Sequence, residues 1–251
     1  MSAMPATPSP PAQISSESGI RLFVETPLSD LSEIRIDGAQ AHYLISVMRV
    51  KVGTRLKLFD NISGEWLAEV AMLAKRDLIL TLLGHLHPRE TAADLWLAAA
   101  PIRRARYDWV AEKACELGVA RFIPVLTRRA VVDKVKDDRL RAHMIEAAEQ
   151  CGRTALPILS PQIRLTDWLP TLSGRTLFFA DEEGGAPFAD AIAANPGPAT
   201  ILIGPEGGFD DAERTLISAT AGAVPVSLGP RILRADTAAV AAVAVWMAVS
   251  T

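Results

Sequence analysis

The feature that most restricts the fold is a regular alternation of short apolar segments with longer amphipathic ones after residue 93. Strands that alternate with helices are typical of a mostly parallel sheet with helices on both faces. The sequence therefore predicts an α/β domain in the second part of the chain. Its strands are expected at Leu95–Ala99, Arg121–Leu126, Thr176–Ala180, Ala199–Ile203 and Val224–Leu228, and its helices near Arg104–Leu117, Asp138–Cys151, Pro187–Ala194, Asp210–Ala221 and Thr237–Val249.

The first third of the chain follows a different pattern, in which short strands follow one another. One helix interrupts them, with Asp37 as a possible cap and an apolar stripe of Ala41, Leu44, Ile45 and Met48. Five strands and one helix favour a small barrel over residues 20–88. The strands are expected at Arg21–Glu25, Glu33–Ile36, Arg55–Phe59, Glu65–Met72 and Asp77–Leu83.

Composition excludes several classes of protein. The longest unbroken apolar run, Ala238–Val249, has 12 residues, too few to cross a bilayer, so no membrane partner is expected. Residues 1–19 are rich in Pro and Ser and lack the basic and apolar regions of a signal peptide, so we expect a disordered tail. Two cysteines, Cys115 and Cys151, make neither a disulfide framework nor a metal set, which suits a reducing cytoplasm.

The net charge of −3 hides a strongly basic segment. Between His42 and Lys57 there are Arg49, Lys51 and Arg55 but no acidic residue. Such a surface can bind a phosphate backbone, although a solvated face remains an alternative.

Two loops that follow strands are candidates for chemistry, because ligands of α/β sheets bind beyond the carboxyl ends of the strands. The first, residues 203–209, reads Ile-Gly-Pro-Glu-Gly-Gly-Phe and fits neither dinucleotide nor P-loop spacing. The next helix starts with Asp210 and Asp211, and Asp210 with Glu213 resembles a capping box, which argues against a phosphate. A neutral or cationic ligand fits better, and a simple tight turn is the other interpretation.

The second loop precedes the last helix and carries Arg231 and Arg234, with Asp236 or Thr237 expected as the helix cap. Arginines beside an apolar segment need acceptors, which could be Glu206, Asp236, backbone carbonyls or a substrate phosphate. There is no serine-nucleophile elbow and no zinc spacing, and His85 and His87 lie in an expected linker. No metal is therefore expected.

Taken together and in this order, the two loops resemble the signature of the RsmE family of ribosomal RNA methyltransferases, in the SPOUT superfamily. The resemblance covers nearly the whole chain after the tail. It includes Arg21-Leu-Phe-Val, His42-Tyr-Leu with Val47-Met-Arg-Val50, Lys113-Ala-Cys-Glu-Leu-Gly-Val119, Glu146-Ala-Ala-Glu-Gln-Cys-Gly-Arg153, Ile203-Gly-Pro-Glu-Gly-Gly-Phe209, and Leu228-Gly with Arg231-Ile-Leu-Arg-Ala-Asp-Thr-Ala238.

The resemblance implies a PUA-like RNA-binding barrel at residues 20–88 and a trefoil-knotted methyltransferase domain at residues 89–251. It also implies S-adenosylmethionine (SAM) as cofactor, a homodimer, and methylation of N3 of one uridine in 16S ribosomal RNA of the small subunit. One departure is Asp236, where the family pattern has Glu.

The implied site residues fall into three groups. Arg231, Arg234 and Glu206 are the catalytic candidates. The expected cofactor contacts are Ile203, Gly204, Pro205, Glu206, Gly207, Gly208, Leu228, Gly229, Ile232 and Leu233. The expected RNA contacts are Arg21, His42, Arg49, Lys51, Arg128 and Arg153. Two alternatives stay open: a non-catalytic RNA-binding or ribosome-assembly factor with the same fold, and a nucleotide-dependent oxidoreductase, which lacks its fingerprint here.

Overall fold

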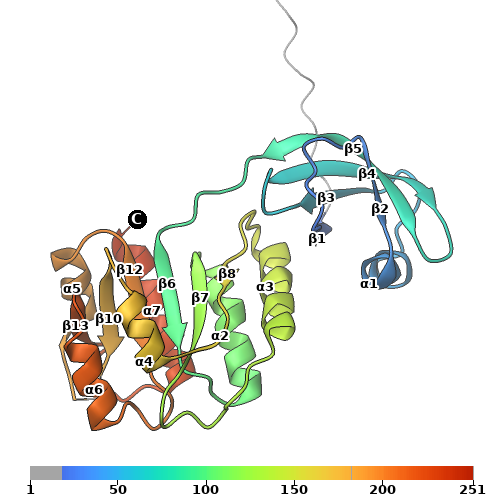
Figure 1. Ribbon diagram of the computed structural model, residues 1–251. Coiled ribbons are helices and arrows are strands. Elements are labelled where there is room, and N and C mark those ends of the chain that lie inside the picture. The colour runs from blue at the N-terminus through green and yellow to red at the C-terminus, as the bar shows by residue number, and fades with distance from the viewer. Residues whose placement is uncertain (1–18, 182, 251) are drawn as a thin grey trace, which may run out of the picture. The chain divides into compact units, whose positions relative to one another are not determined.

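The computed structural model describes residues 19–181 and 183–250, which divide into two compact units (Figure 1). The first unit comprises the described residues up to Phe59 together with Glu65–His87. The second comprises Asp60–Gly64 and the chain from Pro88 onward. The expected disordered tail lies, except for Gly19, outside the described residues.

The first unit is built on one five-stranded sheet in the order β1-β3-β4-β5-β2. Only the pair β1–β3 is parallel, and the other neighbours are antiparallel. A short helix and a π-helical turn follow β2. The elements are β1 (Arg21–Phe23), β2 (Glu33–Ile36), α1 (Gly38–His42), η1 (Tyr43–Val47), β3 (Arg55–Phe59), β4 (Glu65–Leu73) and β5 (Leu78–His87).

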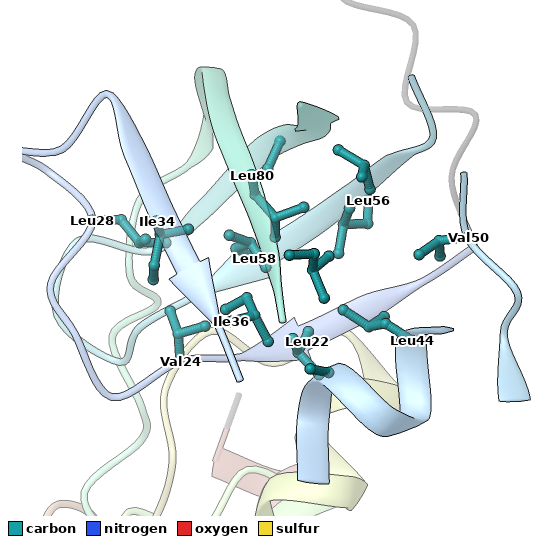
Figure 2. Packing of buried hydrophobic residues seen from close by; sticks show 14 residues of the cluster. Leu22, Val24, Leu28, Ile34, Ile36, Leu44, Val50, Leu56, Leu58 and Leu80 are labelled. Carbon is teal, nitrogen blue, oxygen red and sulfur yellow. The ribbon is translucent and has the colours of Figure 1, made fainter. Parts of the chain in front are cut away.

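Alternate residues of these strands form the core of the first unit (Figure 2). Leu56 and Leu58 of β3 are fully buried, whereas Lys57 between them is not. This period of two arises because successive side chains of a strand point to opposite faces. Leu44 and Val50 close the core from the helical side, so the segment between them is anchored at both ends.

The π-helical turn alters one prediction. Met48, expected in the apolar stripe of the helix, is 38% exposed, whereas Leu44 is fully buried. The Met48 amide bonds to the Tyr43 carbonyl, five residues back, so the wider turn rotates Met48 away from the core.

The second unit contains a sheet in the order β11-β13-β10-β12-β6-β7-β8, and β9 also pairs with β7. Every strand pair in it is parallel, which confirms the predicted α/β class. Its strands are β6 (Leu95–Ala99), β7 (Arg121–Leu126), β8 (Ile158–Leu159), β9 (Ile163–Arg164), β10 (Thr176–Ala180), β11 (Ala186–Pro187), β12 (Ala199–Ile203) and β13 (Ala223–Ser227). Its helices are α2 (Arg104–Glu116), α3 (Asp137–Cys151), α4 (Leu165–Trp168), η2 (Leu169–Thr171), α5 (Phe188–Ala194), α6 (Asp211–Ser218) and α7 (Ala235–Ser250).

Helices cover both faces of this sheet. On one face Phe178 of β10 packs edge-on against Phe188 of α5, and α7 contacts both α2 and α5. On the other face Phe179, the next residue of β10, joins a buried cluster with Trp168 of α4 and Ile217 of α6. The sheet is therefore apolar on both sides, as a parallel sheet must be.

Two local predictions are wrong. His85 and His87, expected in a linker, belong to β5, and the His85 ring contacts the Trp66 ring at 4.8 Å between centroids with a tilt of 58°. Helix α7 begins at Ala235, so Asp236 lies in its first turn and not at its cap. The deep knot stays a prediction of the resemblance. Among the described helices, none combines the length and apolarity that a membrane span requires.

Candidate active site

A cavity of about 430 Å³ lies at the carboxyl ends of β10, β12 and β13. The residues after each of these strands contribute to its wall: Asp181 after β10, Gly204 after β12 and Leu228 after β13. All the predicted cofactor contacts except Gly207 line it, and so do the three catalytic candidates Glu206, Arg231 and Arg234. The structure thus brings together two loops that the sequence separates by about two dozen residues.

The glycine-rich loop after β12 is a tight turn. The Gly208 amide donates to the Pro205 carbonyl at 2.9 Å, and Gly208 has a φ of 66°. A side chain is strained at this φ, so glycine is the suitable residue. A Cβ at Gly204 would lie only 3.2 Å from the Phe209 ring. The absence of a side chain at Gly204 therefore allows the backbone to approach that ring closely.

The loop after β7 holds the glycine-rich loop from outside the cavity. Arg129 donates from Nη1 to the Gly207 carbonyl at 2.8 Å. The Arg128 amide donates to the Glu213 carboxylate at 2.7 Å, and the Arg128 guanidinium contacts Asp210 at 3.2 Å. Sequence reasoning missed Arg129, although its position in the loop after a strand of a parallel sheet was an available signal.

The predicted capping box at the start of α6 is confirmed. The Glu213 amide donates to Asp210 Oδ1 at 2.7 Å, and the Asp210 amide donates to Glu213 Oε2 at 3.2 Å. The hydrogen bond from the Glu213 amide, together with Arg128, holds the pKa of the Asp210 carboxyl below its usual value. These carboxylates occupy the anion-binding end of the helix, which disfavours a phosphate there.

The arginines of the second loop are exposed and border the cavity. Among the described residues, no carboxylate lies within 4.0 Å of Arg231 or Arg234. Asp236, which the sequence offered as their partner, instead faces Arg106 at 3.7 Å. Both arginines line the cavity without an acidic partner among the described residues, so their charge is available there to an anionic group of a substrate.

An ion pair that the sequence did not predict forms another part of the cavity wall. Arg214 of α6 contacts Asp181 at 2.9 Å and Glu183 at 2.7 Å. The side chains of Arg214 and Asp181 are only 14% and 8% exposed. Asp181 directly follows β10. Ligands of α/β sheets bind beyond the carboxyl ends of the strands, so the argument that located the other two loops also applies to Asp181.

The predicted RNA contacts divide into exposed and buried groups. His42, Arg49 and Lys51 are exposed in the first unit, and the side chain of Arg128 is 68% exposed in the second. Arg21 is only 10% exposed, where it pairs with Glu65 and lies 4.5 Å above the Phe59 ring.

Arg153 is also enclosed, with 6% of its side chain exposed. It donates to the carbonyls of Cys115 and Val119 and to the Glu90 carboxylate. These contacts give it a structural role within the second unit, and its contact with RNA stays a prediction.

Cys115 is a buried thiol of low reactivity. Burial raises the pKa of the Cys115 thiol to about 12, and its Sγ lies 3.2 Å from the Met144 carbonyl. Within the described part of the chain, no group of three metal-ligating side chains occurs.

The parallel sheet with a loop-lined cavity fits an α/β enzyme, and comparison with known families gives its class, the methyltransferases that act on RNA. The RNA methyltransferase domain family matches residues 89–247, and the RNA methyltransferase PUA domain family matches residues 36–83. The ribosomal RNA small subunit methyltransferase E of Rickettsia conorii is 32% identical over 228 residues, which cover 89% of this chain and 93% of the relative. The protein of the same name from Bacillus subtilis is 28% identical over 87% of this chain and 92% of its own.

Solved structures agree with this assignment. A methyltransferase from Legionella pneumophila with bound SAM superposes with a TM-score of 0.84 at 28% identity, over 91% of this chain and 97% of its own. The ribosomal RNA small subunit methyltransferase E of Neisseria gonorrhoeae bound to SAM gives 0.80 at 26% identity, over 90% and 95%. The chain belongs to the RsmE family of SPOUT-type RNA methyltransferases.

Proposed function

We propose that this protein transfers a methyl group from SAM to N3 of one uridine in the 16S ribosomal RNA of the small subunit. The observation that carries the proposal is the cavity in which the glycine-rich loop faces the loop of Arg231 and Arg234. Its volume of about 430 Å³ is in the range of pockets that hold a ligand of this size.

The lining of the cavity fits SAM. Apolar side chains such as Val226 and Leu233 can cover an adenosine, and backbone groups of Gly204 and Gly229 can bond to its polar edge. Carboxylates of Asp181 and Glu206 also face the cavity. Asp181 is paired with Arg214, so Glu206 and the carboxylates at the start of α6 are the groups that favour a ligand with a sulfonium cation over a ligand with a phosphate.

The chain's own residues then prepare the uridine. When SAM is bound, it supplies a methyl carbon that N3 attacks in line, while the carbon–sulfur bond breaks and its electrons remain on sulfur. N3 must first lose its proton, which leaves negative charge on the uracil oxygens. We assign the stabilisation of that charge to Arg231 and Arg234 and the uptake of the proton to Glu206, because all three residues line the cavity.

Exposed basic side chains in both units support RNA as the substrate. Residues 20–88 carry His42, Arg49 and Lys51, and residues 89–251 carry Arg128 beside the glycine-rich loop. Each positive charge that contacts a phosphate displaces a counterion, so RNA affinity should fall steeply with salt. We assign RNA binding mainly to residues 20–88 and methyl transfer to residues 89–251.

The protein acts as a homodimer in the cytoplasm, where small ribosomal subunits are available. The support for a dimer is apolar surface on neighbouring helices: Trp109 of α2 is 40% exposed and Val249 of α7 is 44% exposed. Helices α2 and α7 contact each other, so these residues belong to one helical layer.

The test uses pure protein, radiolabelled SAM and small subunits that lack the modification. Label in 3-methyluridine at one site, identified by mass spectrometry after digestion, would establish the reaction. SAM binding without any transferred label would instead support a non-catalytic assembly factor, and Asp236→Glu would then test whether the shorter carboxylate is the cause.

A further inference from the structure

We propose that the segment from His42 to Val52 binds unpaired nucleotides of the RNA substrate, with the Tyr43 ring stacked on a base. The proposal rests on the proposed function, in which RNA is the substrate. It adds that this surface recognises unpaired RNA and that the Tyr43 side chain contacts a base. We call the exposed residues of this segment the π-turn surface: His42, Tyr43, Ser46, Val47, Met48, Arg49, Lys51 and Val52.

The first observation is that four exposed apolar side chains lie within one short segment. Tyr43 is 40% exposed, Val47 61%, Met48 38% and Val52 63%. Their neighbours Leu44 and Val50 are buried in the core and anchor this segment. The four exposed apolar side chains are therefore not part of that core. Exposed apolar side chains gathered in this way indicate a binding surface.

The second observation is charge. Between Gly38 and Phe59 there is no acidic residue, and no described carboxylate lies within 4.0 Å of Arg49 or Lys51. By contrast, Arg55 and Lys57 on the adjacent strand β3 pair with Glu69 and Glu65. The cations of the π-turn surface are therefore available to an anionic partner, whereas those of β3 are neutralised.

The third observation is backbone conformation. Arg49 has a φ of 53°, in the left-handed region where a residue with a Cβ costs energy. It lies two residues after the end of the π-helical turn, and such turns are frequent at functional sites. The fold thus maintains an unfavourable geometry that presents Arg49 beside the exposed Met48.

These observations favour unpaired RNA over a duplex. An RNA helix offers phosphates and a shallow groove, and its bases are already stacked, so it gives exposed tyrosine and methionine side chains nothing to cover. An unpaired base offers a π-face for the Tyr43 ring, and its phosphates reach Arg49 and Lys51. A protein partner could cover the exposed apolar side chains, but it would need additional acidic residues to pair with Arg49 and Lys51.

The experiment measures binding of the full chain to a fluorescently labelled single strand of RNA, and to the same strand annealed to its complement, at one salt concentration. Tyr43→Ala should weaken single-strand binding about tenfold and duplex binding less than twofold, and Tyr43→Phe should bind like the wild type. Arg49→Gly, which suits the left-handed backbone, should weaken both and reduce the salt dependence. Leu83→Ala, at an equally exposed leucine of β5, is the matched control.

The proposal is overturned if Tyr43→Ala binds the single strand as the wild type does, or weakens both forms equally. A variant that binds RNA normally but loses affinity for intact subunits would also overturn it, in favour of a protein partner. Methylation assays separate this result from the proposed function. Wild-type protein that transfers no methyl group but shows Tyr43-dependent binding would refute only the proposed function.

Discussion

Arg129 and Gly207 lie 78 residues apart in sequence, yet the Arg129 guanidinium donates a 2.8 Å hydrogen bond to the Gly207 carbonyl. This bond joins the loop after β7 to the turn that borders the candidate cofactor cavity. A Cβ on Gly207 would lie 3.5 Å from the Arg129 side chain, so the arginine packs directly over the turn. The orientation of the turn therefore depends on a residue that does not line the cavity.

Replacing that residue should weaken cofactor binding. In Arg129→Ala we expect the affinity for SAM to fall about tenfold, because a hydrogen bond from a charged donor contributes roughly 1.5–3 kcal/mol and this one is partly solvated. Calorimetric titration with SAM measures the change, with Lys134→Ala as a control on the same loop. Unchanged affinity in Arg129→Ala would show that the turn holds its conformation without the bond.

The catalytic assignment predicts a different response at the second loop. Arg231→Gln and Arg234→Gln should each lower kcat about a hundredfold, the usual cost of removing one donor that stabilises a developing anion. The dissociation constant of SAM should change little, because the proposed partner of these side chains is the uracil and not the cofactor. Arg76→Gln, at an exposed turn of the first unit, is the control. A loss of SAM affinity that matches the loss of kcat would assign the arginines to the cofactor.

The proposed dimer predicts that a charge on the α2 surface separates the subunits. Trp109→Glu should shift the mass measured by light scattering from two chains to one, because burying an unpaired carboxylate is unfavourable. Leu216→Glu provides the matched control, since Leu216 is similarly exposed on α6, over the opposite face of the sheet. If Trp109→Glu keeps the mass of two chains, the interface lies elsewhere.

Acid should weaken the fold in part through Asp210. Because the folded chain lowers the pKa of this carboxyl, the unfolded chain takes up its proton first as the pH falls. The contribution of Asp210 to stability is full above the ordinary pKa of 3.8 and is lost as the pH falls through the lower folded value. Urea unfolding of Asp210→Ser, which keeps a cap but does not titrate, should show a shallower loss of stability below pH 3.8. Equal slopes for the two proteins would contradict the assignment.

The two thiols should differ in reactivity. Burial raises the pKa of Cys115 to about 12, so almost no thiolate forms there at pH 8, whereas Cys151 is exposed. Native protein treated with iodoacetamide at pH 8 should be alkylated once, at Cys151, as peptide mass spectrometry will show. Native Cys151→Ser should remain unmodified until denaturant is added, and modification of Cys115 in the folded chain would contradict its burial.

Much of the second unit could be predicted because its signals are local. Each expected strand and helix of that unit overlaps an observed one, since an apolar run or a helical stripe is visible within a few residues of sequence. The cavity could be located for the same reason, because loops after parallel strands share one edge of the sheet. Helix α4, only four residues long, was too short to leave a periodic signal.

Side-chain partners were harder to predict because they depend on distant residues. Arg21 is enclosed by Glu65, 44 residues away, and Arg153 by Glu90, 63 residues away. Nothing near Arg21 or Arg153 in the sequence distinguishes them from exposed arginines such as Arg128. Met48 was misplaced for another reason, since a π-helical turn changes the period on which the expected stripe was based.

The order of strands in the second sheet has a consequence for how the protein is made. Strand β6, in the interior of the sheet, has β12 as one of its two neighbours, and Ala99 is aligned with Ile203. More than a hundred residues must therefore leave the ribosome before β6 acquires that neighbour, whereas the strands of the first unit lie within residues 21–87. Long-range parallel pairing of this kind forms slowly. During translation the first unit can fold while the apolar β6 still lacks this partner, so nascent chains stalled before β12 should be the species that chaperones capture.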